Sequence, residues 1–160
     1  MKIAVLSDTH ISTVTRELVQ IHKDYLADAD MILHAGDIVS SDVVSFLDRG
    51  NFHGVSGNMD PYDVRDMLPV KKIIKAGSQR IGLIHGWGFS SGLEQRILAE
   101  FEDVDAIVYG HSHKAANHIR NNILFFNPGS AIGFRPASPR SMGFLEIEGD
   151  EIRGRIVELR

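Results

Sequence analysis

The chain has 160 residues, 43% of them hydrophobic, which predicts a single domain over residues 1–160 with a sizeable core. It contains no cysteine, which excludes disulfides, thiolate zinc sites, iron–sulfur clusters and cysteine nucleophiles. Its net charge is −4 and no apolar run approaches the roughly 20 residues of a membrane span, so we expect a cytoplasmic protein that binds neither duplex nucleic acid nor a membrane.

The first third of the chain alternates strand and helix. Apolar runs of strand length are found at 2–7, 31–35 and 52–57. Between them, residues 17–27 have apolar side chains at helical spacing. Residues 41–50 predict a second helix, with Ser41 or Asp42 as its N-cap and Gly50 after its end. This alternation is typical of parallel βαβ units.

The middle of the chain changes pattern. Residues 70–77 and 79–86 predict two strands joined by a turn at Gly77–Ser78. Residues 93–101 have one apolar face and predict a helix, and residues 104–110 predict another buried strand.

Two hairpins complete the chain. Residues 117–130 predict a hairpin that turns at Asn121–Asn122, because asparagine tolerates positive φ. Residues 142–159 predict a second hairpin that turns at Gly149–Asp150. The loop at 131–141, rich in Pro, Gly and Ser, is the most irregular segment. Together these elements predict an α/β sandwich with mixed sheets.

Side chains able to hold a metal follow five of the predicted strands. They are Asp8, His10, Asp37, Asn58, His85, His111 and His113. Open α/β sheets place their sites beyond the carboxyl ends of the strands, so we expect these side chains to meet. Each has a plainer explanation as a turn residue, a helix N-cap or a half-buried histidine. All five strand ends would need such an explanation at once, which favours a common site.

The chemistry of this set indicates a pair of metal ions. Carboxylate, amide oxygen and imidazole suit Mn, Fe, Zn, Ni or Co better than Ca. Seven ligands are too many for one metal and suit two metals about 3.5–4 Å apart that share a carboxylate. Such a pair lowers the pKa of a shared water and holds the oxygens of a phosphate, which is the arrangement for phosphoryl hydrolysis. From spacing alone, His111 and His113 serve one metal if the strand continues through them, and two if a turn starts at Gly110.

The ordered motifs D-T-H, G-D, G-N, H-G and G-H-S-H, followed by N-P-G-S at 127–130, resemble the calcineurin-like metallophosphoesterase superfamily. Within it the chain resembles the small bacterial and archaeal YfcE-like phosphodiesterases, a branch that also resembles the retromer subunit of eukaryotes. The resemblance implies a four-layer αββα sandwich of two mixed β-sheets flanked by helices.

The resemblance also implies the roles of the candidate ligands. The first metal would be bound by Asp8, His10, Asp37 and His113. The second would be bound by Asp37, Asn58, His85 and His111, with Asp37 bridging. Hydrolysis would proceed by in-line attack of a hydroxide held between the metals, with Asp37, Asn58 and His111 as catalytic residues. Manganese is the first choice of metal, with Ni, Fe, Zn or Co as alternatives.

Two positions depart from the family pattern. Many members carry a histidine after the asparagine that assists the leaving group, and this chain has Met59 there. A thioether donates no proton, so we expect weak activity on poor leaving groups. Water or Asp60 is a candidate for a substitute acid; the alternative role of Asp60 is to orient the loop or a metal-bound histidine. Trp87 stands where the branch often has a second histidine. It would line the substrate pocket and stack on a base or aryl group, or simply cover the edge of the core.

The sequence therefore predicts a metal-dependent phosphodiesterase acting on a small phosphodiester, with nucleotide-derived esters and a homo-oligomer as open options. Met59, Trp87, Asn127 and Arg135 are the candidate substrate-binding residues. For Asn127 two roles stay open: it ties the N-P-G-S turn to the site, or it belongs to a purely structural turn. Two other functions stay open: a metal-binding interaction scaffold with little activity, like the retromer subunit, and a phosphomonoesterase.

Overall fold

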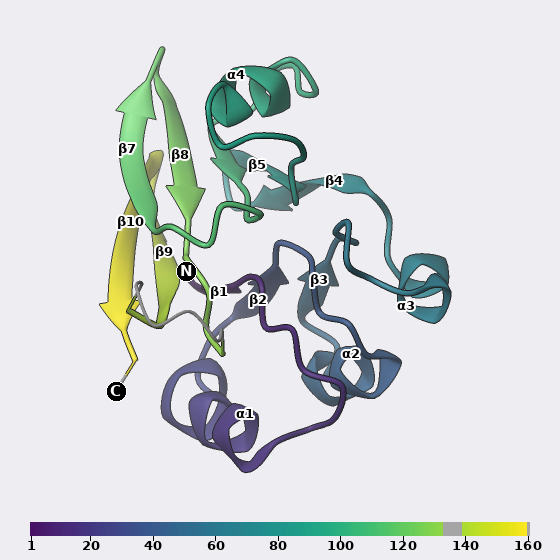
Figure 1. The fold of residues 1–160 in the computed structure, drawn as a ribbon. Coiled ribbons are helices and arrows are strands. Elements are labelled where there is room, and N and C mark those ends of the chain that lie inside the picture. The colour runs from purple at the N-terminus through teal and green to yellow at the C-terminus, as the bar shows by residue number, and fades with distance from the viewer. Residues whose placement is uncertain (133–138, 160) are drawn as a thin grey trace.

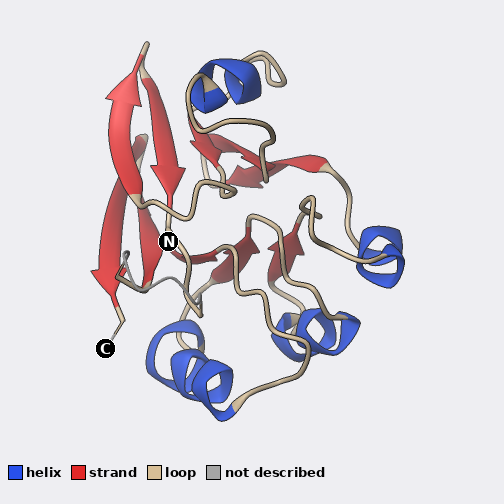
Figure 2. Ribbon diagram, in the orientation of Figure 1, coloured by secondary structure: helices blue, strands red, loops and turns tan. Residues whose placement is uncertain are grey.

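The computed structural model describes residues 1–132 and 139–159 and contains two five-stranded sheets with helices on their outer faces (Figures 1 and 2). Figure 1 shows α1 and α2 beside the strands β1 to β3, and α4 beside β5 at the opposite end of the view. No helix in this described part of the chain is both long and apolar enough to cross a membrane.

The first sheet has the order β10-β9-β1-β2-β3. Its strands are β1 (Lys2–Leu6), β2 (Met31–His34), β3 (Phe52–Gly54), β9 (Ser141–Glu148) and β10 (Glu151–Glu158). The strands β1, β2 and β3 run parallel, whereas β9 runs antiparallel to both of its neighbours. The helices that connect these parallel strands are α1 (Arg16–Ile21), which continues as the π-helix η1 (His22–Leu26), and α2 (Ser41–Leu47).

The second sheet has the order β4-β5-β6-β8-β7. Its strands are β4 (Lys71–Ala76), β5 (Gln79–Ile84), β6 (Ala106–Val108), β7 (Ala116–Arg120) and β8 (Ile123–Asn127). Here β5, β6 and β8 run parallel, and the edge strands β4 and β7 run antiparallel. The remaining helices are α3 (Tyr62–Met67), between β3 and β4, and α4 (Leu93–Leu98), between β5 and β6.

Alternation along the strands builds the layers. In β1, Ala4 and Leu6 pack against α1 and α2, while Ile3 and Val5 pack against the second sheet. The second sheet does the same, because Phe126 faces the first sheet and the neighbouring strand residues face α4. Three apolar layers therefore separate helices, sheet, sheet and helix. This is the predicted four-layer αββα sandwich, which the structure confirms.

The predicted turns are confirmed, with φ values of 53° at Asn121 and 62° at Asn122. Positive φ at both central residues is the backbone of a type I′ hairpin turn, which matches the twist of the paired strands. Gly149 in the terminal hairpin likewise has a φ of 57°.

Two local predictions were wrong, and one helix was not predicted. The N-cap of α2 is Ser40, not Ser41 or Asp42, because Ser40 is the last extended residue and its carbonyl already accepts from the N–H of Val44. The helix α4 ends at Leu98, since the chain tightens there into three-residue turns. The helix α3 was not expected, because it buries only Val64 and so lacks an apolar period.

The contact between Gly143 of β9 and the ring of Phe126 gives a stability prediction. A Cβ at Gly143 would lie 2.3 Å from Phe126, so Gly143→Ala should lower the free energy of unfolding by roughly 1–3 kcal/mol through overpacking. Phe126→Leu would make room for the added methyl group, so the double variant should lose less than the sum of the single losses. Urea unfolding of the four proteins measures this coupling. Gly149→Ala, where no atom lies within 4 Å, is the control and should add independently; additivity at Gly143 would contradict the packing assignment.

Candidate metal centre

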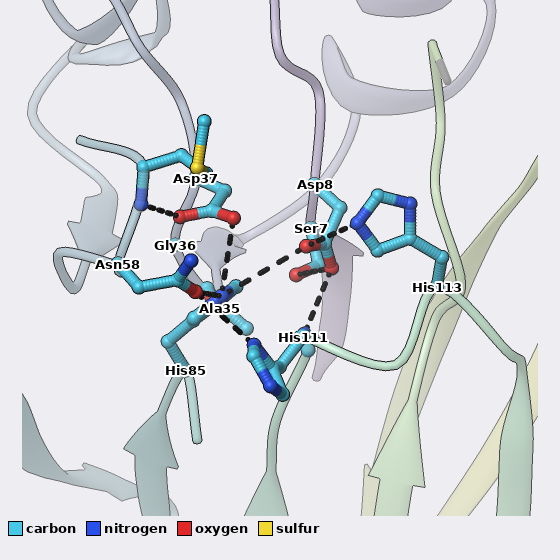
Figure 3. A network of polar contacts seen from close by, with 12 residues as sticks. Ser7, Asp8, Ala35, Gly36, Asp37, Asn58, His85, His111 and His113 are labelled. Atoms are coloured by element: carbon cyan, nitrogen blue, oxygen red, sulfur yellow. Dashed lines mark hydrogen bonds and ion pairs between the residues drawn. The ribbon is translucent and has the colours of Figure 1, made fainter. Parts of the chain in front are cut away.

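The two sheets bring the carboxyl ends of their parallel strands to one place. Asp8 and His10 follow β1, Asp37 follows β2, and Asn58 follows β3. From the second sheet, His85 follows β5, and the G-H-S-H loop with His111 and His113 follows β6. Figure 3 shows these loops facing one another, with the carboxylate of Asp8 between the imidazoles of His113 and His85 and the carboxylate of Asp37 directed at His85. All seven predicted ligands therefore meet in one region.

The backbone of this region is strained. Positive φ angles occur at Asp8 (52°), His10 (48°), Asp37 (56°), His111 (69°) and His113 (57°). Residues with a side chain rarely adopt this conformation, and such residues cluster where function needs an unusual direction of the side chain. The strand therefore does not continue through G-H-S-H. A turn starts at Gly110, and the side chains of His111 and His113 diverge.

Hydrogen bonds hold these strained loops together. The N–H of Asp8 donates to the carbonyl of Gly36 (3.0 Å) and the N–H of His10 donates to the carbonyl of Asp37 (3.1 Å). The N–H of His111 donates to Oδ2 of Asp8 (3.1 Å), and the hydroxyl of Ser7 donates to the same oxygen (2.6 Å). The Asp8 carboxylate therefore links the loops of both sheets through one oxygen.

The other oxygen of Asp8 lies in a first group of ligand atoms. Its Oδ1 is 3.2 Å from Nε2 of His113 and 3.7 Å from Nε2 of His10, and the two Nε2 atoms are 3.2 Å apart. The Asp8 side chain is buried, and its Oδ1 has no hydrogen-bond partner among the described residues. A buried carboxylate oxygen without a donor, facing two imidazole nitrogens, fits a divalent cation.

Asp37 and His85 form a second group with Asp8. Oδ2 of Asp37 is 3.3 Å from Nε2 of His85 and 3.6 Å from Nε2 of His10, so it faces both groups. Asp8 is also shared, because its Oδ1 lies 4.0 Å from Nε2 of His85. One ligand atom from each member of either triad, Asp8–His10–His113 or Asp8–Asp37–His85, lies within 4.8 Å of the others.

Asn58 and His111 extend the second group with atoms that carry only lone pairs. The Nδ1–H of His85 donates to the carbonyl of Ala35 (2.7 Å), which leaves its Nε2 as an acceptor. The Nε2–H of His111 donates to the carbonyl of Gly88 (2.7 Å), which leaves its Nδ1 as an acceptor. Both acceptors lie 3.1 Å from Oδ1 of Asn58. With these tautomers three lone pairs face one another, a clash that a metal cation or a proton on His85 relieves, so this set of ligand atoms fits a metal.

The charges of the region support the same conclusion. Burial raises the pKa of Asp8, but contacts with His10, His113, His85 and Ser7 outweigh it and hold that pKa well below its usual range. The Asp37 pKa is also lowered, since His85 and the N–H of Met59 outweigh burial. Asp8 raises the pKa of His10, and Asp37 raises that of His85 against the effect of burial. Without a cation His10 and His85 hold protons more readily than a free imidazole does, so metal binding here would release protons.

The predicted substrate-binding residues lie in different settings. The side chains of Met59 and Trp87 are 60% and 43% exposed beside the centre. Asn127 is fully buried; its Nδ2 donates to the carbonyl of Gly110 (3.0 Å) and to Ser112, and we assign it a positioning role for the G-H-S-H loop. Arg135 lies outside the described residues.

Two buried residues, Asp60 and His34, support the loops of the centre; Asp60 was expected from the sequence and takes the loop-orienting role, whereas the role of His34 escaped the sequence-based prediction. Asp60 is buried, and its carboxylate accepts from the N–H groups of Asp37 (3.0 Å), Val39 (2.6 Å) and Gly57 (2.7 Å). It therefore joins the loops after β2 and β3 and is not placed as a free acid. A Cβ at Gly57 would lie 2.2 Å from Oδ1 of Asp37, so only glycine fits there. Gly57 of the G-N motif was the one sequence feature that could have indicated this close contact with Asp37.

His34, at the end of β2, is a fully buried neutral imidazole. The N–H of Gly36 donates to its Nδ1 (3.2 Å), so its Nε2–H donates to the hydroxyl of Thr9 (3.2 Å). Burial lowers the pKa of His34 to about 3. It therefore ties the loops after β1 and β2 together without adding charge behind the two carboxylates.

Comparison with known proteins agrees with this geometry. The model of the calcineurin-like phosphoesterase superfamily domain matches residues 1–150. The chain is 33% identical over 161 residues to a probable metallophosphoesterase of Methanothermobacter thermautotrophicus, with 98% of this chain and 92% of that protein covered. The chain therefore belongs to the calcineurin-like phosphoesterase superfamily, as its motifs predicted.

Solved structures show the same fold. Vacuolar protein sorting 29 of Cryptosporidium parvum superposes with a TM-score of 0.82 at 27% identity, covering 99% of this chain and 91% of that one. YfcE, a phosphoesterase from E. coli, superposes with a TM-score of 0.68 at 24% identity, covering 91% of this chain and 88% of that one.

Replacing Asp60 tests whether it organises the loops. In Asp60→Asn, the amide NH₂ would face backbone N–H groups that now donate to a carboxylate oxygen. We expect the free energy of unfolding to fall by about 1–3 kcal/mol and metal affinity to fall with it. Urea unfolding and calorimetric titration with Zn²⁺ measure the two effects. Asp63→Asn, an exposed position on α3, is the control; equal behaviour of the two variants would contradict the assignment.

His34 predicts how stability depends on pH. Its pKa is about 3 in the folded protein and 6.5 in the unfolded chain, so below pH 6.5 only the unfolded chain takes up this proton. The resulting stability is complete above pH 6.5 and decreases as the pH falls towards 3. The metal-free His34→Gln variant keeps a donor and an acceptor but lacks this proton, so its stability should fall less steeply. Urea unfolding of both proteins between pH 3 and pH 6.5 measures this dependence. Equal slopes of unfolding free energy against pH would contradict the role assigned to His34.

Proposed function

We propose that this protein is a metal-dependent phosphodiesterase with a dinuclear centre, which hydrolyses its substrate by in-line attack. The observation that carries the proposal is the convergence of possible ligand atoms. Oδ1 of Asp8 has no hydrogen-bond partner among the described residues, and Oδ1 of Asn58 lies 3.1 Å from both Nε2 of His85 and Nδ1 of His111. Such a set stays together at neutral pH when cations lie among its members.

The two triads suggest how the metals would be held. Asp8, His10 and His113 would hold the first metal, and Asp37, Asn58, His85 and His111 would hold the second. Oδ2 of Asp37 faces His10 and His85 alike, which supports its role as the shared carboxylate. Manganese is our first candidate, with Ni, Fe, Zn or Co compatible with the same ligands.

Two bound dications would supply an activated water and would neutralise the charge of a phosphodiester. The protein's own part is orientation. The carbonyls of Ala35 and Gly88 fix which nitrogens of His85 and His111 face the centre. The Met59 N–H donates to Oδ1 of Asp37 (2.8 Å), which leaves the other oxygen of Asp37 directed at the imidazoles.

The surroundings of the centre favour substrates with good leaving groups. Met59 has no proton to donate, and the Asp60 carboxylate is buried and accepts three backbone N–H groups, so neither is placed as a general acid. An ester whose leaving oxygen is already weakly basic does not need that proton. We therefore propose a small phosphodiester substrate with a stable leaving group, in preference to a monoester.

Metal-dependent turnover tests the proposal. Metal-stripped protein given Mn, Ni, Co or Zn should hydrolyse bis(p-nitrophenyl) phosphate faster than the p-nitrophenyl monoester. Asp37→Ala should lower kcat by about 10³-fold or more, because it removes the shared carboxylate. Asp28→Ala, at an exposed carboxylate in the turn after η1, is the matched control and should keep full activity. Tight metal binding without turnover for any metal would instead favour an interaction scaffold.

Met59→His tests the missing acid. Histidine at this position would supply a proton donor beside the centre, since the Met59 side chain is 60% exposed there. We expect hydrolysis of a diester with an alkyl leaving group to rise about tenfold or more, while the aryl diester changes little. The ratio of kcat values for the two substrates is the measurement. An equal change for both would mean that leaving-group protonation does not limit the reaction.

A further inference from the structure

A pocket of about 330 Å³ opens directly beside the candidate centre. Asn58 and His85 belong both to its lining and to the second group of ligand atoms. The remaining lining includes Ile84, Val70, Trp87 and Arg65 and is mainly apolar. A ligand bound at the centre therefore has an apolar space next to it. The volume is at the lower end of the range for ligand sites, which suits one aromatic ring system.

The backbone of the loop that carries Trp87 is held in place. Arg96 of α4 donates from Nη2 (2.9 Å) and Nε (3.2 Å) to the carbonyl of Trp87, and from Nη1 to the carbonyl of Ser91 (3.0 Å). The Nε2–H of His111 donates to the carbonyl of Gly88 in the same loop. The backbone from which the indole projects is thus held by α4 on one side and by the centre on the other.

Apolar side chains around this pocket are exposed to water. Trp87 is 43% exposed and Val70 is 71% exposed. Covering such surfaces is favourable, and an indole face in particular stacks well on planar rings. Beside them, Nη2 of Arg65 donates to the carbonyl of Asn58 (2.9 Å), and Arg65 forms no ion pair with a described residue. Its remaining N–H groups can serve the polar edge of a bound ring.

We propose that this pocket is a specificity subsite that takes a planar aromatic arm of the substrate, an aryl group or a nucleobase, stacked on Trp87. The inference rests on the proposed function, because it places the phosphate of the same ester at the metal centre. It narrows the substrate class to phosphodiesters with at least one aromatic arm. Trp87 is a specificity-determining residue in this assignment and does not touch the reacting atoms.

Trp87 is also the only tryptophan of the chain, so its fluorescence reports on this pocket alone. The Zn²⁺-loaded protein is titrated with inorganic phosphate, methyl phosphate, phenyl phosphate and adenosine 5′-monophosphate. We expect the two aromatic phosphates to quench the emission and to bind about tenfold more tightly than methyl phosphate, the gain that one stacked ring provides. Tighter binding of the nucleotide than of phenyl phosphate would identify a nucleobase as the arm.

Variants in one loop separate stacking from other effects. Calorimetry should show that Trp87→Ala loses the tenfold preference for aromatic phosphates and that Trp87→Phe keeps part of it, while methyl phosphate binds all forms alike. Phe89→Ala is the matched control, because Phe89 is 88% exposed in the same loop and does not line the pocket. It should keep the full preference.

The outcomes distinguish the two proposals. Equal affinity for aromatic and methyl phosphates in the unchanged protein would overturn the subsite and leave the metal centre standing. An aromatic preference that depends on Trp87 without any turnover would support the subsite and count against the hydrolytic function. Failure of every phosphate to bind the Zn²⁺-loaded protein would overturn both.

Discussion

The buried carboxylate of Asp8 is the constraint on which the rest of the structure depends. One of its oxygens accepts from Ser7 and from the N–H of His111, which joins the first strand of one sheet to the G-H-S-H loop of the other. Its second oxygen has no donor among the described residues and faces the imidazoles of His10 and His113. An ionised group in this position is costly unless a cation completes it, so the arrangement favours metal binding over stability.

Backbone strain and packing around that carboxylate are consistent with a metal-binding role. Five of the seven candidate ligands have positive φ, a conformation that the chain keeps only because neighbouring groups hold it. Asp60 and His34 hold the loops by accepting hydrogen bonds from backbone N–H groups, on the buried side of the centre. The glycines at 57 and 110 allow close approach, since a Cβ at either would overlap a ligand loop. The centre is therefore rigid before a metal or substrate binds.

The surroundings of the centre differ in kind from its interior. The ligand atoms are polar and mostly buried, whereas the adjoining pocket at Trp87 and Val70 is apolar and open. Met59 lies at the same opening without a proton to donate. In the proposed phosphodiesterase, such a site would bind the phosphate strongly and give its leaving group little assistance. Substrate choice would then depend on the organic arms of the ester, one of which the proposed subsite would contact.

The sequence pattern by itself determined the α/β sandwich with mixed sheets, the hairpins and the seven candidate ligands, while the number of layers came from the resemblance to the superfamily. Alternating apolar residues fix which face of a strand is buried, and polar residues after parallel strands must meet at one edge. The short helix α3 and the true N-cap at Ser40 could not be read, because one buried valine and adjacent serines carry no periodic signal.

Only the tertiary structure decided how the ligands are oriented and supported. Whether His111 and His113 converge or diverge depends on backbone angles that the spacing leaves open. The tautomers of His85 and His111 depend on the carbonyls of Ala35 and Gly88, which any residue would provide. Asp60 connects two loops because three backbone N–H groups donate to its carboxylate. Trp87 lies in a loop whose backbone Arg96 holds. Backbone groups leave no mark in the sequence, so these contacts appear only once the chain is folded.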